Sequence, residues 1–319
     1  MFSQRNDLII HQQRCTKGWI RWGFSFFFSL LFALPSLSES FTKKYPRHFY
    51  STQDFRWSMY GAFNEPPLAP KNLLVLLHGG GLWSANFESM MDALTQQGIP
   101  VIAVDLPGHG WTWPLQKDFR RYDLDVMGAN LFQLLQSLPA EKIHLVGHSW
   151  GGGLALQVAS LHPSKLQQLT LISTSGLDVK ETWEWEILKI PVIGRWMTGL
   201  IRPYMFRKSL EKSYYDSDFV TDEQVETYYQ VYRGPYLRRA LYEYSRRIHW
   251  KSVEDKLSTI TIPAIFVWGL QDKYAPLEQL PRFLNAMPVA RPILVDQCSH
   301  MAHEECLNSW FPMWRPFGR

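Results

Sequence analysis

Residues 143–156 read IHLVGHSWGGGLAL, and this stretch decides the fold. A largely apolar run, 143–146, leads directly into Gly147-His148-Ser149-Trp150-Gly151, and a glycine-rich helical pattern follows. A strand, a sharp turn at a serine and a helix together lift the serine hydroxyl above the carboxyl end of a parallel sheet. The flanking glycines let backbone and helix approach closely because they carry no Cβ atom. The stretch therefore predicts an accessible serine at a tight strand-to-helix turn.

The same alternation of strand and helix patterns surrounds this turn. Four further apolar runs of four or five residues stand at 73–77, 101–104, 169–172 and 264–268. Helical patterns between them cover 87–97, 124–137 and 152–161. Runs that are apolar throughout are typical of strands buried on both faces of a parallel sheet. The pattern predicts an α/β fold with a mostly parallel, doubly wound sheet, preceded by a hairpin over 47–52 and 55–63.

The alternation stops between residues 177 and 250. This segment has no apolar strand pattern, and 15 of its 74 residues are aromatic. Helical patterns cover 183–189, 192–205, 222–231 and 236–248. A connection of this length exceeds what a strand–helix–strand crossover needs. We therefore expect residues 45–176 and 251–319 to form the core, with 177–250 as a helical cap inserted after the sixth strand.

Residues 1–38 have the pattern of a targeting segment. Four basic residues precede an uncharged run over 22–34, and Pro35 and small residues follow. Thirteen uncharged residues are fewer than the ~20 that span a bilayer. The segment predicts a signal peptide or, because its basic stretch is long, an uncleaved N-terminal anchor. The protein is then exported (periplasmic or secreted) or membrane-anchored, with membrane contact through this segment only.

Charge and composition exclude several classes of protein. Residues 1–38 contain four of the 33 basic and one of the 29 acidic side chains, which leaves 29 basic and 28 acidic in the rest. The remainder has no basic excess, so no nucleic-acid partner is expected. A hydrophobic content of 46% excludes a disordered chain, and three cysteines exclude a disulfide-dense scaffold.

A serine hydroxyl becomes a strong nucleophile only when a base removes its proton. His300 follows the last expected strand by a short loop, from which it could reach Ser149, whereas we expect His303 to begin the next helix. We therefore favour His300 as the base. Asp272 directly follows a strand and is the favoured acid, because Asp296 lies too close in sequence to His300 to orient its ring. The order Ser149, Asp272, His300 is the order that α/β sheets of this kind use.

Donors for a developing oxyanion are expected from a second strand end. His78-Gly79-Gly80-Gly81 follows the strand pattern at 73–77. Glycines allow backbone N–H groups there to face a ligand, and such donors stabilise the transition state of acyl transfer. We expect the backbone amides of Gly80 and Trp150 to form the oxyanion hole. No metal and no organic cofactor is called for.

Taken together, these motifs resemble those of the α/β-hydrolase superfamily, within its group of capped bacterial serine hydrolases. The resemblance rests on HGG at 78–80, DLPGHG at 105–110, GHSWGG at 147–152, GLQD at 269–272 with Pro276, and His300 with Glu305. It implies the α/β-hydrolase fold and a structural role for the 105–110 turn. Ser299 and Leu307 depart from the usual glycine and proline. Related haloalkane dehalogenases and epoxide hydrolases carry aspartate at the turn, so Ser149 argues against both.

The expected reaction is hydrolysis of a carboxylic ester with an apolar acyl or alcohol group. Ser149 would form an acyl-enzyme, with His300 as the base and Asp272 holding its ring. The substrate is then a small apolar ester. One alternative is another reaction of the same triad, either proline iminopeptidase-like or carbon–carbon bond hydrolysis in vinylogous diketones. A non-catalytic ligand binder that kept the fold is a further alternative.

Two cysteines lie on either side of the expected base. Cys298 and Cys306 are eight residues apart. In an oxidising compartment they could form a disulfide, and otherwise they remain two separate thiols. A disulfide needs Cα atoms within about 7 Å of each other, so the spacing leaves both arrangements open.

Overall fold

The computed structural model describes residues 37–61, 70–116, 118–180, 183–234, 236–314 and 316. The predicted signal peptide or anchor, residues 1–38, lies outside the described residues except for its last two, which begin helix α1 (Leu37–Lys44). Among the described helices, none is long and apolar enough to cross a membrane.

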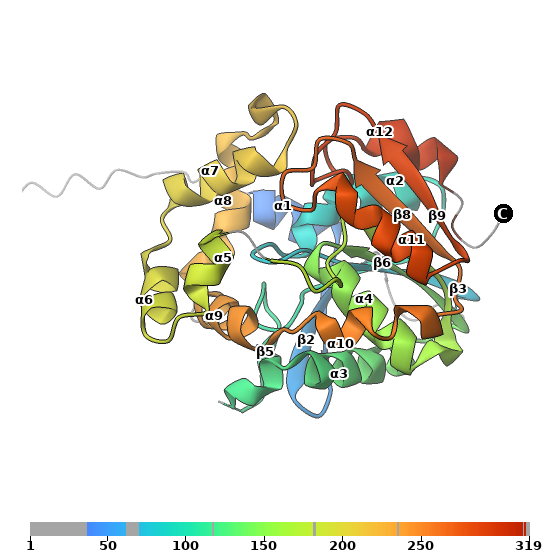
Figure 1. The fold of residues 1–319 in the computed structure, drawn as a ribbon, viewed down its shortest axis with the longest axis horizontal. Coiled ribbons are helices and arrows are strands. Elements are labelled where there is room, and N and C mark those ends of the chain that lie inside the picture. Colours follow the sequence, from blue (N-terminus) through green and yellow to red (C-terminus); the bar gives the residue numbers. More distant parts are fainter. Residues whose placement is uncertain are drawn as a thin grey trace, which may run out of the picture. The chain divides into compact units, whose positions relative to one another are not determined.

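The described residues form a mixed sheet in which most neighbours run parallel (Figure 1). The strands are β1 (Arg47–Ser51), β2 (Phe55–Gly61), β3 (Asn72–Leu77), β4 (Val101–Val104), β5 (Trp113–Pro114), β6 (Lys142–His148), β7 (Leu166–Ile172), β8 (Ala264–Gly269) and β9 (Ala290–Val295). Their order is β1-β2-β4-β3-β6-β7-β8-β9, with β5 beside β2. Only the pairs that involve β2 are antiparallel. The predicted α/β-hydrolase fold is confirmed.

Helices cover both faces of this sheet. The core helices are α2 (Glu88–Gln96), α3 (Leu124–Ser137), α4 (Trp150–Leu161), α10 (Lys251–Glu254), α11 (Leu280–Ala286) and α12 (Leu307–Trp310). Successive residues of β3 belong to different hydrophobic clusters: Val75 to the cluster that includes residues of α3, α4 and α11, and Leu76 to the cluster that includes residues of α2 and α12. Strands buried on both faces explain why their sequences are continuously apolar.

The order of the strands brings two chain segments together at one point. The chain passes from β3 to β4 on one side and then to β6 on the other side of β3. Such a reversal leaves a crevice at the carboxyl ends of the strands, where open α/β sheets bind ligands. Leu77 of β3 lies opposite Gly147 of β6. The segments after both strands therefore start side by side.

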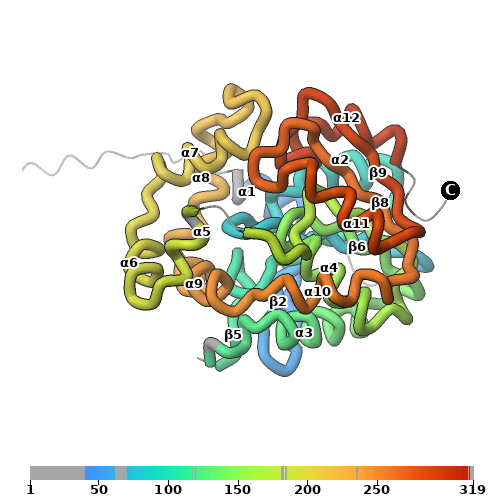
Figure 2. Tube along the Cα trace, viewed as in Figure 1, coloured from blue at the N-terminus to red at the C-terminus, as the bar shows by residue number. Residues whose placement is uncertain are grey.

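A helical region is inserted between β7 and β8, in the yellow to orange part of the tube in Figure 2. Its helices are α5 (Trp183–Leu188), α6 (Ile193–Leu200), α7 (Pro203–Ser213), α8 (Asp222–Tyr229) and α9 (Leu237–Arg247). The expected single helix over 192–205 is wrong, because Pro203 begins a new helix and disfavours helical backbone at the residue before it. The insertion follows the seventh strand by count, since the two-residue β5 was not predicted. The boundaries 177 and 250 for a separate cap remain a prediction.

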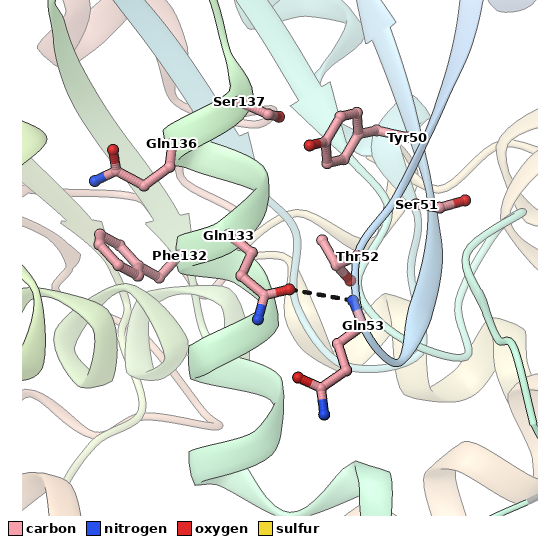
Figure 3. A pocket seen from close by; sticks show the side chains of 8 residues that line it. All are labelled: Tyr50, Ser51, Thr52, Gln53, Phe132, Gln133, Gln136 and Ser137. Atoms are coloured by element: carbon pink, nitrogen blue, oxygen red, sulfur yellow. Dashed lines mark hydrogen bonds between the residues drawn. The ribbon is translucent and has the colours of Figure 1, made fainter.

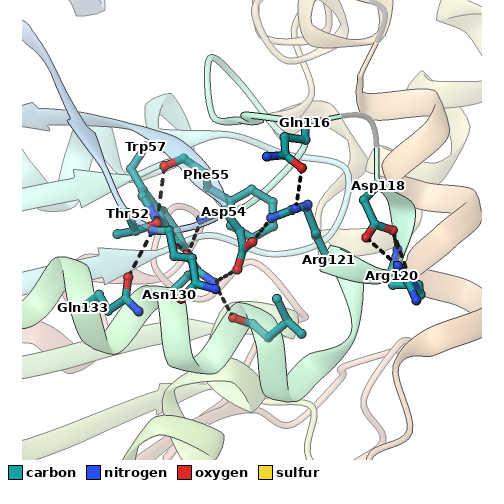
Figure 4. Close-up of polar contacts among 12 residues, drawn as sticks. Thr52, Asp54, Phe55, Trp57, Gln116, Asp118, Arg120, Arg121, Asn130 and Gln133 are labelled. Carbon is teal, nitrogen blue, oxygen red and sulfur yellow. Dashed lines mark hydrogen bonds and ion pairs between the residues drawn. The ribbon is translucent and has the colours of Figure 1, made fainter.

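The N-terminal hairpin is attached to α3 by a mostly buried polar network (Figure 4). The Asn130 side chain accepts from the Thr52 hydroxyl at 2.7 Å and from the Asp54 N–H at 2.9 Å, and it donates to the Asp54 carboxylate at 2.7 Å. Arg121 forms an ion pair with the same carboxylate. A groove of about 520 Å³ lies beside this attachment, where the Gln53 N–H donates to Gln133 (Figure 3). None of the predicted site residues lines it.

The close approach of α4 to β3 gives a test of the fold. A Cβ atom at Gly151 would lie 2.2 Å from the Leu77 carbonyl oxygen, which is backbone and cannot move aside cheaply. We expect Gly151→Ala to lower the free energy of unfolding by about 3 kcal/mol or more in urea titration. Gly199→Ala is the matched control, since a Cβ there meets nothing within 4 Å. It should be neutral or stabilise by up to about 1 kcal/mol. Equal effects of the two variants would contradict this packing.

Candidate active site

Ser149 lies at the turn between β6 and α4 with φ 50° and ψ −117°. A non-glycine residue with positive φ is strained by about 1–3 kcal/mol, so its surroundings must hold it. The Ser149 N–H donates to the Ile172 carbonyl at 3.0 Å. The Ser149 carbonyl accepts from Gly152 at 3.0 Å, from Gly153 at 3.1 Å and from Ser175 at 3.0 Å. Four backbone hydrogen bonds therefore fix the residue predicted as nucleophile.

His300 and Asp272 form a buried hydrogen-bonded pair. The His300 Nδ1–H donates to Asp272 Oδ2 at 2.9 Å and lies 3.1 Å from Oδ1. Oδ1 also accepts from the backbone N–H groups of Tyr274 and Ala275, both at 2.8 Å. The carboxylate is thus held in one orientation from three sides. Because Nδ1 carries the proton toward Asp272, Nε2 is the ring nitrogen that can accept one.

The backbone of His300 is connected both to the serine turn and to the insertion. Its carbonyl accepts from Nε2 of His148, the residue before the serine, at 3.0 Å. The rings of His148 and His300 lie 4.8 Å apart. The His300 N–H donates to the carbonyl of Ser213, the last residue of α7, at 3.0 Å. The structure therefore places the His300–Asp272 pair next to the residue that precedes Ser149, and the three residues come from distant parts of the chain.

The two alternative residues are engaged elsewhere. His303 is fully buried, and its Nε2–H donates to the Asn86 side chain at 2.7 Å. Burial lowers the pKa of His303 to about 3, so its ring is neutral. It lies in a turn, and α12 begins only at Leu307, so the expected helix start at His303 is wrong. Asp296 is exposed and accepts from Gln271 at 3.0 Å.

A disulfide closes the loop that carries His300. Cys298 and Cys306 are bonded, with their Cα atoms 6.0 Å apart. Of the two arrangements that the sequence left open, a disulfide or two separate thiols, the structure contains the disulfide. Both cysteines are buried. His300, His303 and Glu304 all lie within the closed loop.

The predicted oxyanion residues adjoin each other. A Cβ atom at Gly80 would lie 2.8 Å from the indole ring of Trp150, so the Trp150 side chain packs directly against the Gly80 backbone. Trp150 is the first residue of α4, where backbone N–H groups have no partner four residues earlier. Their role as donors remains a prediction.

The turn over 105–110 holds the glycine loop in place. The Gly81 N–H donates to Nε2 of His109 at 3.0 Å. Asp105 is buried and accepts from the Ser84 N–H at 2.9 Å, the Ser84 hydroxyl at 2.6 Å and the Trp111 N–H at 3.0 Å. Each of these contacts supports the backbone rather than facing His300. This agrees with the structural role that the resemblance implies for the turn.

The side of the turn that faces the insertion is aromatic. The ring of Trp150 lies 4.8 Å from that of Trp185 in α5 and 5.0 Å from that of Tyr244 in α9. A narrow apolar cavity behind Trp150 is lined by Leu106, Leu124, Met127, Trp150, Leu154, Tyr244, Ile248 and Trp250. The wall next to Ser149 is therefore suited to an apolar group.

Glu304 is a buried polar residue that the sequence analysis missed. Its Oε2 accepts from Tyr214 at 3.0 Å, from Tyr228 at 2.8 Å and from Gln224 at 2.9 Å, and its Oε1 accepts from Asn86. Three of these partners belong to the insertion, so Glu304 joins the His300 loop to it. Burial raises the pKa of Glu304 to about 7. An acidic residue in a short turn has no sequence pattern that distinguishes it from a solvated one.

Comparisons with known proteins identify the family of this chain. A family model for the α/β hydrolase fold matches residues 72–306. A 2-hydroxy-6-oxononadienedioate/2-hydroxy-6-oxononatrienedioate hydrolase from Paraburkholderia phymatum is 31% identical over 251 residues, which cover 74% of this chain and 83% of that protein. A Bacillus subtilis AB hydrolase superfamily protein is 26% identical over 244 residues, 73% of this chain and 85% of that protein. The chain therefore belongs to the α/β-hydrolase family, and it is a hydrolase.

Solved structures share the fold at lower sequence identity. The 2-hydroxy-6-oxo-6-phenylhexa-2,4-dienoate hydrolase from Rhodococcus sp. strain RHA1 superposes with a TM-score of 0.70 and is 20% identical, over 84% of this chain and 96% of that chain. A membrane phospholipase A superposes with a TM-score of 0.65 and is 19% identical, over 84% of each chain.

Glu304 gives a test that depends on pH. Its raised pKa means that the folded state holds a proton that the unfolded state loses above about pH 4.5. This stabilisation is complete at low pH and is lost as the pH rises through about 7. We expect the difference in unfolding free energy between wild type and Glu304→Gln to change by up to about 3 kcal/mol from pH 4.5 to 7 in denaturant titrations. The difference should favour wild type most at the acidic end.

A difference that does not vary with pH would contradict a neutral, buried Glu304. The wild type itself should lose stability on acidification, because burial lowers the pKa of His109 to about 4 and that of His144 to about 3. The unfolded chain binds these protons first, below about pH 6.5. The comparison with the variant isolates Glu304 from this opposite trend.

Proposed function

We propose that this protein is a serine hydrolase in which Ser149 attacks a substrate carbonyl carbon. The observation that carries the proposal is the hydrogen-bonded His300–Asp272 pair. The His300 carbonyl also accepts a hydrogen bond from His148, the residue before Ser149. Nε2 of His300 takes the serine proton, and Asp272 stabilises the resulting imidazolium. The N–H groups of Gly80 and Trp150 would stabilise the oxyanion.

The bond that breaks, we infer, is a carbon–carbon bond next to the ketone of a vinylogous diketone. A 2-hydroxy-6-oxo dienoate first tautomerises to its 2-keto form, in which the 2-hydroxyl loses its proton and C5 gains one. After the serine adds to the C6 ketone, the C5–C6 bond breaks, and the electron pair passes into the C3–C4 double bond that is conjugated with the C2 ketone. His300 returns its proton to the carbon leaving group, and water then hydrolyses the acyl-enzyme. Support comes from the Paraburkholderia phymatum relative, whose name gives this substrate type. Hydrolysis of a carboxylic ester, which the sequence predicts, therefore becomes the second candidate reaction.

Ester hydrolysis stays a second candidate because of one feature of the site. The wall beside Ser149 consists of Trp150, Trp185 and Tyr244, which suit an apolar acyl chain. A 2-hydroxy-6-oxononadienedioate carries two carboxylates by its name, and these would need polar partners elsewhere. A membrane phospholipase A of the same fold shows that the scaffold also occurs in ester hydrolases.

The residue roles predict a sharp difference between paired variants. Ser149→Ala and His300→Ala should each lower kcat by ~10⁴–10⁶-fold in steady-state assays, and Asp272→Asn should do so somewhat less. Asp296→Asn is the matched control, because Asp296 also follows a strand but is exposed. It should retain kcat within about twofold. Loss of turnover in His303→Gln, with turnover kept in His300→Ala, would show that the base is wrong.

The substrate class is tested with a panel of two chemistries. We expect kcat/KM for 2-hydroxy-6-oxononadienedioate or 2-hydroxy-6-oxo-6-phenylhexa-2,4-dienoate to exceed that for p-nitrophenyl butyrate by ~100-fold or more, about 2.7 kcal/mol in transition-state binding. The diketones are followed by loss of their conjugated absorbance. A ratio in the opposite direction would overturn carbon–carbon hydrolysis in favour of ester hydrolysis. Ser149→Ala provides the background rate for both.

A further inference from the structure

The segment 189–208 of the insertion exposes an unusual number of apolar side chains. Val192 is 79% exposed, Trp196 66% and Tyr204 64%. The other exposed apolar residues of the segment are Ile190, Ile193, Leu200 and Met205. We call these seven residues the α6 surface. Ile193, Trp196 and Leu200 lie on α6, and Tyr204 and Met205 lie at the start of α7; both helices are labelled in Figure 1.

Helix α6 is amphipathic, but its apolar stripe points outward. Ile193, Trp196 and Leu200 follow the spacing of one helical face, and all three are exposed. The buried positions of the helix are Gly194 and Thr198. Because the small residues of this helix face inward and its large apolar residues face outward, the large side chains contribute little buried area to the fold.

The turn before α6 supports the same conclusion. Val192 has φ 67°, a conformation that a β-branched residue rarely adopts. It holds this conformation at the tip of the turn, where its side chain is almost fully exposed. Packing inside the described part of the chain therefore does not account for its position.

The charged side chains within residues 189–208 are all basic, and the acidic partners of two of them, Glu186, Glu211 and Asp222, lie just outside this segment. Residues 189–208 contain five basic side chains and no acidic one. Lys189 pairs with Glu186 at 2.7 Å, and Arg207 pairs with Asp222. Within the described residues, Arg195, Arg202 and Lys208 form no ion pair. A surface that combines exposed Trp and Tyr with basic residues fits the interface of an anionic bilayer.

We propose that the α6 surface docks on a lipid bilayer that contains anionic lipid. Tryptophan and tyrosine rings favour the headgroup region, and each nearby lysine or arginine strengthens attraction to anionic lipid. A second copy of the chain fits less well. In a two-fold dimer the same basic residues would face one another, which is repulsive. This surface is additional to the N-terminal segment, through which alone the sequence predicted membrane contact.

The test measures hydrogen exchange by mass spectrometry on the full chain, with and without vesicles. The vesicles contain phosphatidylcholine alone or phosphatidylcholine with phosphatidylglycerol. We expect amide exchange over 193–205 to slow several-fold with the anionic vesicles only. The readout is local, so it separates the α6 surface from attachment through residues 1–38. Vesicle binding without any change over 193–205 would overturn the proposal.

Matched variants test the two parts of the surface. The double variant Val192→Asp with Trp196→Asp should abolish the slowing of exchange over 193–205. The double variant Arg195→Glu with Arg202→Glu should lower partition to anionic vesicles at low salt at least ~10-fold relative to wild type. Val289→Asp, at an exposed apolar site outside the insertion, should change neither. Circular dichroism and turnover of a water-soluble substrate verify that each variant is folded.

Two outcomes would overturn the proposal, one in the wild type and one in a variant. One is slowed exchange over 193–205 that rises with protein concentration in the absence of vesicles, which would assign the surface to a second copy. The other is unchanged slowing with anionic vesicles in folded Val192→Asp with Trp196→Asp.

Discussion

The strained backbone of Ser149 is the constraint on which the rest of the site depends. A serine with φ 50° between a strand and a helix is stable only where several hydrogen bonds hold it. The chain supplies these from β7, from α4 and from the segment after β7. It also leaves room only for hydrogen at Gly151, since α4 begins against the end of β3. The position of the glycine loop after β3 follows from the same contact.

The loop between Cys298 and Cys306 carries His300, the residue that pairs with Asp272 in the site. The disulfide closes it, and the Asp272 carboxylate, the Ser213 carbonyl and the His148 ring hold His300 from three elements. Glu304 ties the same loop to the tyrosines of the insertion. A displacement of the insertion would therefore act on His300 through two connections. These contacts link the position of the insertion to the geometry of His300.

Local patterns in the sequence were sufficient for most of the fold. Continuous apolar runs predicted the buried strands, because each strand contacts helices on both faces. The motif around Ser149 predicted its turn, since only glycines permit the close approach there. The break at Pro203 is also visible in the sequence, but the apolar pattern continues across it and predicts one helix. The two-residue β5 left no pattern that separates it from a loop.

Contacts between distant segments were harder to predict. Position after a strand was enough to propose His300 and Asp272, which the structure joins at 2.9 Å. The Cys298–Cys306 bond depends on a Cα distance that spacing does not determine. Glu304 acquires its role only from partners about 80 or more residues away in the chain. The choice between ester and carbon–carbon cleavage depends on substrate contacts, because both reactions use the same three side chains.

The central claim is that His300 and Asp272 activate Ser149 at this turn. Labelling with a fluorophosphonate probe, read by intact-protein and peptide mass spectrometry, tests it most directly. We expect one adduct per chain, on the peptide that contains Ser149, with a labelling rate that falls at least ~100-fold in His300→Ala. Absence of an adduct in folded protein, an adduct on another residue, or an unchanged rate in His300→Ala would contradict it.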